Sequence, residues 1–244
     1  MKKYKYESHM HTWPVSQCGK AAVQEALTFY KDIGYDGVFI TNHFIGGNIN
    51  YDHNAPYEEQ LDFFLTDYYE GLKIGKEIGI KVFFGVELAQ LFPNGHWGGT
   101  DFLVYGLKPS WYREHPEIVT LEKPQALDII REAGGLVIQA HPYRKDSYIE
   151  WIRLYPWNID GAEVLNASRP DFESRMGLAF AEAYGLLKTA GSDNHKAGRA
   201  EWLGCMSTDE PLCSEADFVK AVREGICDID KIRNPRLSDP SIRI

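Results

Sequence analysis

Strand and helix signals alternate along almost the whole chain, and this alternation limits the possible fold more than any other feature. Short apolar runs such as 37–41 and 81–87 are typical of buried strands, and the segments 21–33 and 58–78 between them are typical of helices. We count about seven such units, which is close to the number that closes a barrel. The pattern therefore predicts a mainly parallel sheet with helices outside it.

The remaining segments fit the same plan. We expect strands at 4–11, 101–105, 136–139, 161–165 and 187–191, helices at 124–133, 171–184 and 214–224, and loops at 42–56 and 88–99. The tail from 226 to 244 is expected to pack as an edge strand or an arm. No linker or repeat divides the chain, so residues 1–244 are interpreted as a single domain.

Bulk composition excludes several classes of protein. The net charge of −9 does not favour an extended nucleic-acid surface. The four cysteines form no CxxC word, and no apolar run is long enough to span a bilayer. No apolar segment of the signal-peptide kind follows the N-terminus. We therefore expect a cytoplasmic protein with reduced thiols and no membrane partner.

Metal-ligand residue types stand where the predicted strands end. The words are His9-Met10-His11, Asn42-His43, Gly85-Val86-Glu87, His141-Pro142 and Asp193-Asn194-His195, with two weaker words, Cys18-Gly19 and Thr100-Asp101. Alternate residues on a strand point the same way, so His9 and His11 project together. Imidazoles and carboxylates from several strand ends can hold two or three divalent ions, which indicates metal-assisted hydrolysis.

Each candidate also has a purely structural interpretation. A buried carboxylate such as Glu87 needs a compensating charge, which a metal or an ion pair would supply. Asp101 could be a polar strand start, and Cys18 a small buried hydrophobic residue. Pro142 is expected to keep His141 extended. Arg144 could grip a phosphate group bidentately or form a surface salt bridge.

The ordered words resemble those of the polymerase and histidinol phosphatase (PHP) superfamily of metal-dependent phosphoesterases. The resemblance runs from His9 to His195 and rests on H-x-H-T, T-x-H, G-V-E, H-P and S-D-x-H taken together. It implies a distorted (β/α)7 TIM-like barrel with its metal site at the carboxyl ends of the strands. It also implies two or three divalent ions, namely zinc, manganese or iron, and hydrolysis of phosphate esters.

Carried over by position, the resemblance implies three sets of ligands. His9, His11, Glu87 and Asp193 would hold a first ion, and Glu87 would bridge to a second ion held by His141. His43 and His195 would hold a third. Asp101 stands where many members have a ligand histidine, and Gln17, next to Cys18, stands where members with three ions often have one. The family word T-D-H is Thr41-Asn42-His43 here, so one acidic group is absent from that word.

The predicted activity is hydrolysis of a small-molecule phosphate ester by metal-activated water. Glu87, Asp193, His195 and Arg144 are the predicted catalytic residues. His43 or His195 would protonate the leaving group only if neither holds an ion. Two alternatives stay open: an amidohydrolase-type metal hydrolase, and a metal-binding PHP-like module without turnover. The substrate, the metal, the filling of the third site and the oligomeric state are not readable from the sequence.

Overall fold

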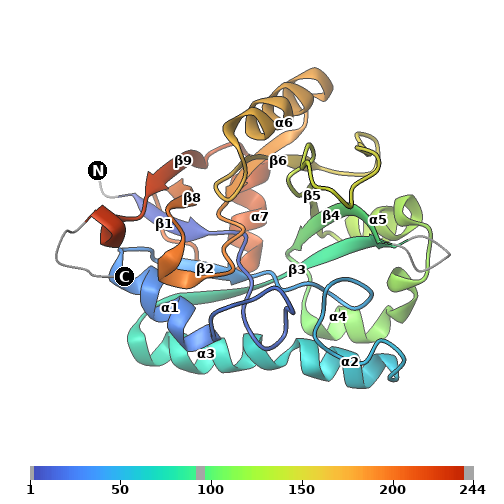
Figure 1. Cartoon of the computed structure of the whole chain (residues 1–244), viewed down its shortest axis with the longest axis horizontal. Helices are drawn as coiled ribbons and strands as arrows, with labels where there is room; N and C mark the ends of the chain where they lie inside the picture. The colour runs from blue at the N-terminus through green and yellow to red at the C-terminus, as the bar shows by residue number, and fades with distance from the viewer. Residues whose placement is uncertain (1–2, 92–96, 239–244) are drawn as a thin grey trace.

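Nine strands form one continuous sheet in the computed structural model, which describes residues 3–91 and 97–238 (Figure 1). The strands are β1 (Tyr4–Glu7), β2 (Gly37–Ile40), β3 (Lys81–Leu91), β4 (Trp97–Tyr105), β5 (Leu136–Gln139), β6 (Gly161–Asn166), β7 (Leu187–Gly191), β8 (Trp202–Thr208) and β9 (Asp228–Arg233). Their order across the sheet is β7-β6-β5-β4-β3-β2-β1-β8-β9. No helix in the described ranges is long and apolar enough to cross a membrane.

Helices connect the strands; most cover the outside of the sheet, whereas α7 packs its apolar face into the barrel core. They are α1 (Val23–Asp32), α2 (Tyr57–Phe64), α3 (Thr66–Ile78), α4 (Pro109–Glu114), α5 (Lys123–Glu132), α6 (Asp171–Tyr184) and α7 (Glu215–Arg223), with short 3₁₀ turns η1 (Pro116–Val119), η2 (Ala197–Arg199) and η3 (Pro235–Ser238). In the view of Figure 1, α1 and α3 lie side by side below β2 and β3.

The sheet curls until its β7 side meets β8, which confirms the predicted barrel. No strand pairing is recorded between β7 and β8 in the described residues; side-chain contacts join them instead. The amide of Ala190 on β7 donates to Met206 Sδ on β8 at 3.1 Å. Ser8, directly after β1, donates its hydroxyl to the Ala190 carbonyl. A Cβ added to Gly204 would overlap the backbone of Gly191, so the two strands approach this closely only because residue 204 is glycine.

The expected parallel sheet is mixed instead. Pairs β1–β2, β2–β3, β5–β6 and β6–β7 are parallel, whereas β3–β4, β4–β5, β1–β8 and β8–β9 are antiparallel. The chain segment 88–99 was expected to be a loop, but β3 continues to Leu91 and β4 begins at Trp97; residues 92–96 lie outside the described ranges. The apolar–polar pattern of these strands is interrupted by glycines, which hid the hairpin.

Other differences are smaller. The single helix expected at 58–78 is two helices that meet at Leu65. Strand β8 was not predicted, whereas β9 confirms an edge strand in the tail. Ser214 caps α7, the helix expected at 214–224: its hydroxyl accepts from the Asp217 amide at 3.2 Å.

An aromatic layer fills the barrel beneath the strand ends that carry the predicted ligands. Phe39 and Phe83 stack at 4.8 Å between ring centroids, and Phe218 of α7 packs on Phe39 at 4.5 Å. Glu87 lies four residues after Phe83 on the same strand face, and Asp101 lies two before Leu103. The period of the strands thus places apolar side chains in the core and the acidic ones at its upper surface.

Candidate metal centre

The structure brings all eight predicted metal ligands to one end of the barrel. His9, His11, His43, Glu87, Asp101, His141 and Asp193 are each at most 6% exposed, and the side chain of His195 is 25% exposed. Asp101 reaches this end from the first half of β4, because β4 runs antiparallel to β3 and its start therefore lies beside the end of β3.

Donor atoms of these residues gather in three groups, each with its atoms within 4.8 Å of one another. We name them the first inner group (His9, His11, Asp193), the second inner group (His9, Glu87, His141) and the outer group (His11, Cys18, His43, His195). The sequence raised Cys18 only as a weak candidate, and the structure places its thiol beside His43 and His195.

Glu87 sits between the groups with imidazoles against both of its oxygens. The residue is 1% exposed. Oε1 lies 3.2 Å from His9 Nε2 and 3.3 Å from His141 Nε2. Oε2 lies 3.3 Å from His11 Nε2 and 2.8 Å from His43 Nδ1. One oxygen thus faces the second inner group, and the other faces His11 and the outer group.

In three imidazoles, Nδ1 makes a hydrogen bond to a neighbouring protein group, and this turns Nε2 toward the site. Nδ1 of His9 faces Glu163 Oε1 at 2.9 Å, and Nδ1 of His11 faces the Ser16 hydroxyl at 3.2 Å. Nδ1 of His195 donates to the carbonyl of Asp193 at 2.8 Å. This leaves Nε2 of His9 and His11 facing each other at 3.2 Å. A cation shared by the two nitrogens would satisfy both lone pairs, as in metal-bound histidines, and a proton on one ring would join them as a hydrogen bond.

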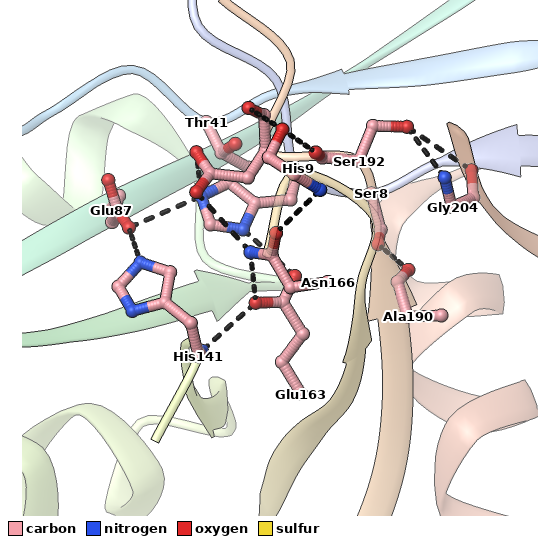
Figure 2. Close-up of polar contacts among 12 residues, drawn as sticks. Ser8, His9, Thr41, Glu87, His141, Glu163, Asn166, Ala190, Ser192 and Gly204 are labelled. Carbon is pink, nitrogen blue, oxygen red and sulfur yellow. Dashed lines mark hydrogen bonds and ion pairs between the residues drawn. The ribbon is translucent and has the colours of Figure 1, made fainter. Parts of the chain in front are cut away.

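Glu163 of β6 supports both inner groups, although the sequence did not single it out (Figure 2). Besides His9 Nδ1, it accepts from the backbone amide of His141 at 3.0 Å and from the Asn166 side chain at 2.9 Å. Asn166 also donates to Asp193 Oδ2 at 3.3 Å. A carboxylate in the middle of a strand that is otherwise apolar was the signal that could have identified Glu163.

A second buried carboxylate, Glu7, fixes the backbone on either side of the inner groups. Its oxygens accept from the amides of His9 and Ser192 at 2.9 Å each and from the Tyr30 hydroxyl at 2.7 Å. Burial raises the pKa of Glu7 to about 7, although these donors oppose the shift. Glycine is required at neighbouring Gly191, because a Cβ there would overlap His9 Cβ and lie 2.8 Å from Glu163 Oε1.

The acidic group absent from the Thr41-Asn42-His43 word is supplied by another element. Asp67 of α3, 1% exposed, accepts from the Thr12 hydroxyl at 2.6 Å and from the Asn42 side chain at 3.2 Å. Asn42 Oδ1 in turn accepts from the Ser16 hydroxyl at 2.8 Å. The carboxylate of this network therefore belongs to Asp67, and it connects to the site through the side chain of Asn42.

Two of the predicted ligands adopt left-handed backbone conformations. The φ angle is +28° at His141 and +50° at Asp193. The expectation that Pro142 keeps His141 extended is therefore wrong. The Glu163 carboxylate, which holds the His141 amide, stabilises the turn that replaces the extended form. Non-glycine residues with this strain are concentrated at functional sites, where the surrounding structure fixes them.

Charges within the site shift several pKa values. Burial raises the pKa of Glu87, but His43, His9 and His11 outweigh this effect and hold its pKa well below the ordinary range. Burial, helped by the charge of Glu87, raises the pKa of Asp101 to about 6. Burial also raises the pKa of the Cys18 thiol, yet hydrogen bonds to His195 and His43 bring it down to about 6. The site thus favours carboxylates and a thiolate together.

A cavity of ≈ 960 Å³ opens over the centre. Cys18, Glu87, Asp193 and His195 line its inner end, together with Arg144, the only arginine or lysine among the lining residues. Arg144 also lies 3.6 Å from Asp146 and over the ring of Tyr148, so it forms a salt bridge while lining the cavity. The outer end has an apolar wall formed by Ile45, Tyr57 and Val119.

Comparisons with known proteins agree on the fold and differ in the activities they name. No protein-family model matches the chain. A two-domain protein of Bacteroides vulgatus that contains a predicted PHP-like metal-dependent phosphoesterase aligns with 94% of this chain and 65% of its own length, at 14% identity and a TM-score of 0.67. PsfC of Pseudomonas syringae aligns with 98% of this chain and 96% of its own, at 15% identity and a TM-score of 0.56.

Two further matches carry different names. An amidohydrolase of Chromobacterium violaceum, solved with sulfate and no metal, aligns with 96% of this chain and 99% of its own, at 14% identity and a TM-score of 0.54. A 77-residue segment, 30% of this chain, is 31% identical to a 5′-3′ exoribonuclease of Haemophilus influenzae but spans only 28% of it. The chain thus has the fold of PHP-like proteins, as the sequence resemblance implied.

Proposed function

We propose that the protein is a metal-dependent hydrolase of phosphate esters of small molecules. The observation that carries the proposal is Glu87, a buried carboxylate with four imidazole nitrogens 2.8–3.3 Å from its oxygens. With these imidazoles neutral, as metal ligands are, the buried charge needs a cation, because leaving it unpaired costs several kcal/mol. Divalent ions held by the three groups would supply that charge, and the convergence of so many donor atoms supports this interpretation.

The donor sets divide the work among the residues. His9, His11 and Asp193 would hold one ion, and His141 and Asp101 a second, with Glu87 bridging the two. Asp101 fits this role because its Oδ2 lies 3.9 Å from His141 Nε2 and the residue is fully buried. When bound, such ions supply a hydroxide-like nucleophile near neutral pH and polarise the phosphoryl group.

The protein's own groups orient the substrate. Arg144 extends into the cavity on the side of Glu87 and Asp193, where its planar guanidinium can donate two hydrogen bonds to phosphate oxygens. His43 and His195 belong to the outer group and act there as ligands, so neither serves as a free acid. Solvent in the open cavity then protonates the leaving group.

A phosphate ester is favoured over an amide because a cation lies at the inner end of the cavity, where an anionic group would be held. The Chromobacterium neighbour keeps amide hydrolysis as the alternative, and the Haemophilus match keeps RNA ends as a second phosphoester candidate. Against RNA, the chain carries a net charge of −9 and its cavity is lined by one arginine and no lysine.

A substrate panel tests the proposal. Metal-free protein is reconstituted with Mn²⁺ or Zn²⁺ and offered small phosphomonoesters, small amides and a 5′-phosphorylated RNA oligonucleotide. We expect turnover of one or more small esters, abolished by a chelator and restored by metal. Turnover of amides only, of RNA only, or of none of the three classes with metal bound would each refute it, and the last result would indicate a binding module.

A further inference from the structure

We propose that the outer group binds a thiophilic divalent ion, such as Zn²⁺, through the thiolate of Cys18 together with His43 and His195. The centre would then combine one thiolate-bearing position with two carboxylate-bearing ones. The inference rests on the proposed function, because it assigns one of the ions that the function requires.

The donor geometry separates this position from the inner groups. The outer group contains a thiol and imidazoles but no carboxylate, whereas each inner group contains one. His11 belongs to both sets, yet its Nε2 lies 3.3 Å from Glu87 and 3.4 Å from Asp193, so it serves the first inner group. The outer ion is left with Cys18, His43 and His195. Three protein ligands leave a fourth position open, as in catalytic zinc sites.

The loop after β1 is built to present Cys18 to the cavity. The Ser16 amide donates to the Thr12 carbonyl, and the Gly19 amide donates to the Ser16 carbonyl, at 3.0 Å each. A Cβ at Gly19 would lie 2.7 Å from the carbonyl carbon of Thr12, so this tight return needs glycine directly after Cys18. Ser16 also bonds to His11 and Asn42, which ties the loop to the inner groups.

The chemistry of the donors predicts which ions the position prefers. A thiolate with two imidazoles favours Zn²⁺ and Co²⁺ over the harder Mn²⁺ and Mg²⁺. The inner groups, with Glu87, Asp101 and Asp193, suit harder ions as well. Binding releases the thiol proton to solvent, so no oxidant or reductant is needed.

Cobalt spectroscopy tests the thiolate directly. Metal-free full-length protein is titrated with Co²⁺, and a thiolate-to-cobalt charge-transfer band is sought in the near ultraviolet. We expect the band in the wild type and in Cys213→Ser, which removes an exposed thiol elsewhere. Cys18→Ser should lack the band while still binding Co²⁺ at the inner groups. A band that persists in Cys18→Ser, or is absent from cobalt-loaded wild type, would overturn the inference.

Alkylation of the wild type gives an answer that does not depend on how a variant folds. Iodoacetamide labelling is followed by peptide mass spectrometry, with the exposed Cys213 as the internal reference. Zn²⁺ should slow labelling of Cys18 at least tenfold and leave Cys213 unchanged. If metals bind and Cys18 labelling is unaffected, only this inference fails. If neither Zn²⁺ nor Co²⁺ binds at all, the proposed function fails with it.

Discussion

The inner and outer groups of the metal centre are built in different ways. The inner ligands come from strands or the residues directly after them, are at most 6% exposed, and are held by the buried carboxylates Glu7 and Glu163. The outer group takes Cys18 from a loop and His195 at 25% side-chain exposure, and both line the cavity. Buried acidic charge makes the inner groups dependent on cations. The outer group carries less negative charge and faces solvent, so its occupancy can vary with the metal supplied.

The largest expected effect follows from removing the charge that joins the groups. Glu87→Gln keeps the shape of the side chain, but an amide is a poor ligand and cannot balance two cations. We expect turnover to fall by several orders of magnitude and metal content to drop, with the circular dichroism spectrum unchanged. Glu215→Gln is the matched control. Glu215 lies on α7 and accepts from the amide of Phe84, which is on β3 like Glu87 but away from the ligands. Near wild-type activity in Glu87→Gln would rule out the bridging role.

Glu163→Gln separates the two regions. The amide keeps the shape but loses the charge that faces His9 Nδ1, and outer-sphere partners of this kind are worth roughly 10–100-fold in metal affinity. We expect the inner groups to weaken by that factor, measured by competition with a chromophoric chelator. The cobalt–thiolate band of the outer group should remain. Equal weakening of both regions would contradict the division between them.

Arg144→Ala and His141→Ala change two residues three positions apart. Arg144 is expected to bind the substrate, and His141 is expected to bind metal. Loss of a bidentate charged hydrogen bond costs about 1.5–3 kcal/mol, or about tenfold to a hundredfold in kcat/KM. Arg144→Ala should lose this much and keep its metals, whereas His141→Ala should lose metal first. Elemental analysis beside steady-state kinetics decides the matter. Metal loss in Arg144→Ala, or unchanged kinetics, would show that Arg144 has another role.

The smallest effect is expected at the outer end of the cavity. Val119→Ala removes apolar surface from the wall, worth about 1 kcal/mol, and should raise KM several-fold for an ester with a bulky apolar group. Methyl phosphate lacks a bulky apolar group and should be unaffected. A rise in KM of equal size for both esters would mean that Val119 acts on the inner end.

The ligand residue types could be predicted from the sequence because strand ends in a barrel share one edge. For His9, Glu87 and Asp193, strand positions and the family resemblance were enough to predict that their side chains gather at one end of the barrel. Asp101 reaches that edge because β4 runs antiparallel to β3, which the expected parallel strand at 101–105 did not foresee. The barrel itself followed from the alternation of strands and helices.

The supporting residues could not be predicted, because their role depends on contacts between distant segments. Glu163 is 154 positions from His9, and Glu7 is 185 from Ser192. The position of Cys18 depends on a loop closed by Gly19, which no strand or helix pattern describes. The strain at His141 likewise depends on Glu163, so the local effect of Pro142 was the wrong guide.

Metal content tests the central claim most directly. Purified full-length protein is supplemented with Zn²⁺ or Mn²⁺, freed of unbound ions and measured by elemental analysis against protein concentration. The three convergent donor groups predict about two equivalents or more in the wild type, more than one tetrahedral ion would need. A clear stoichiometry of one or none after supplementation would contradict the account.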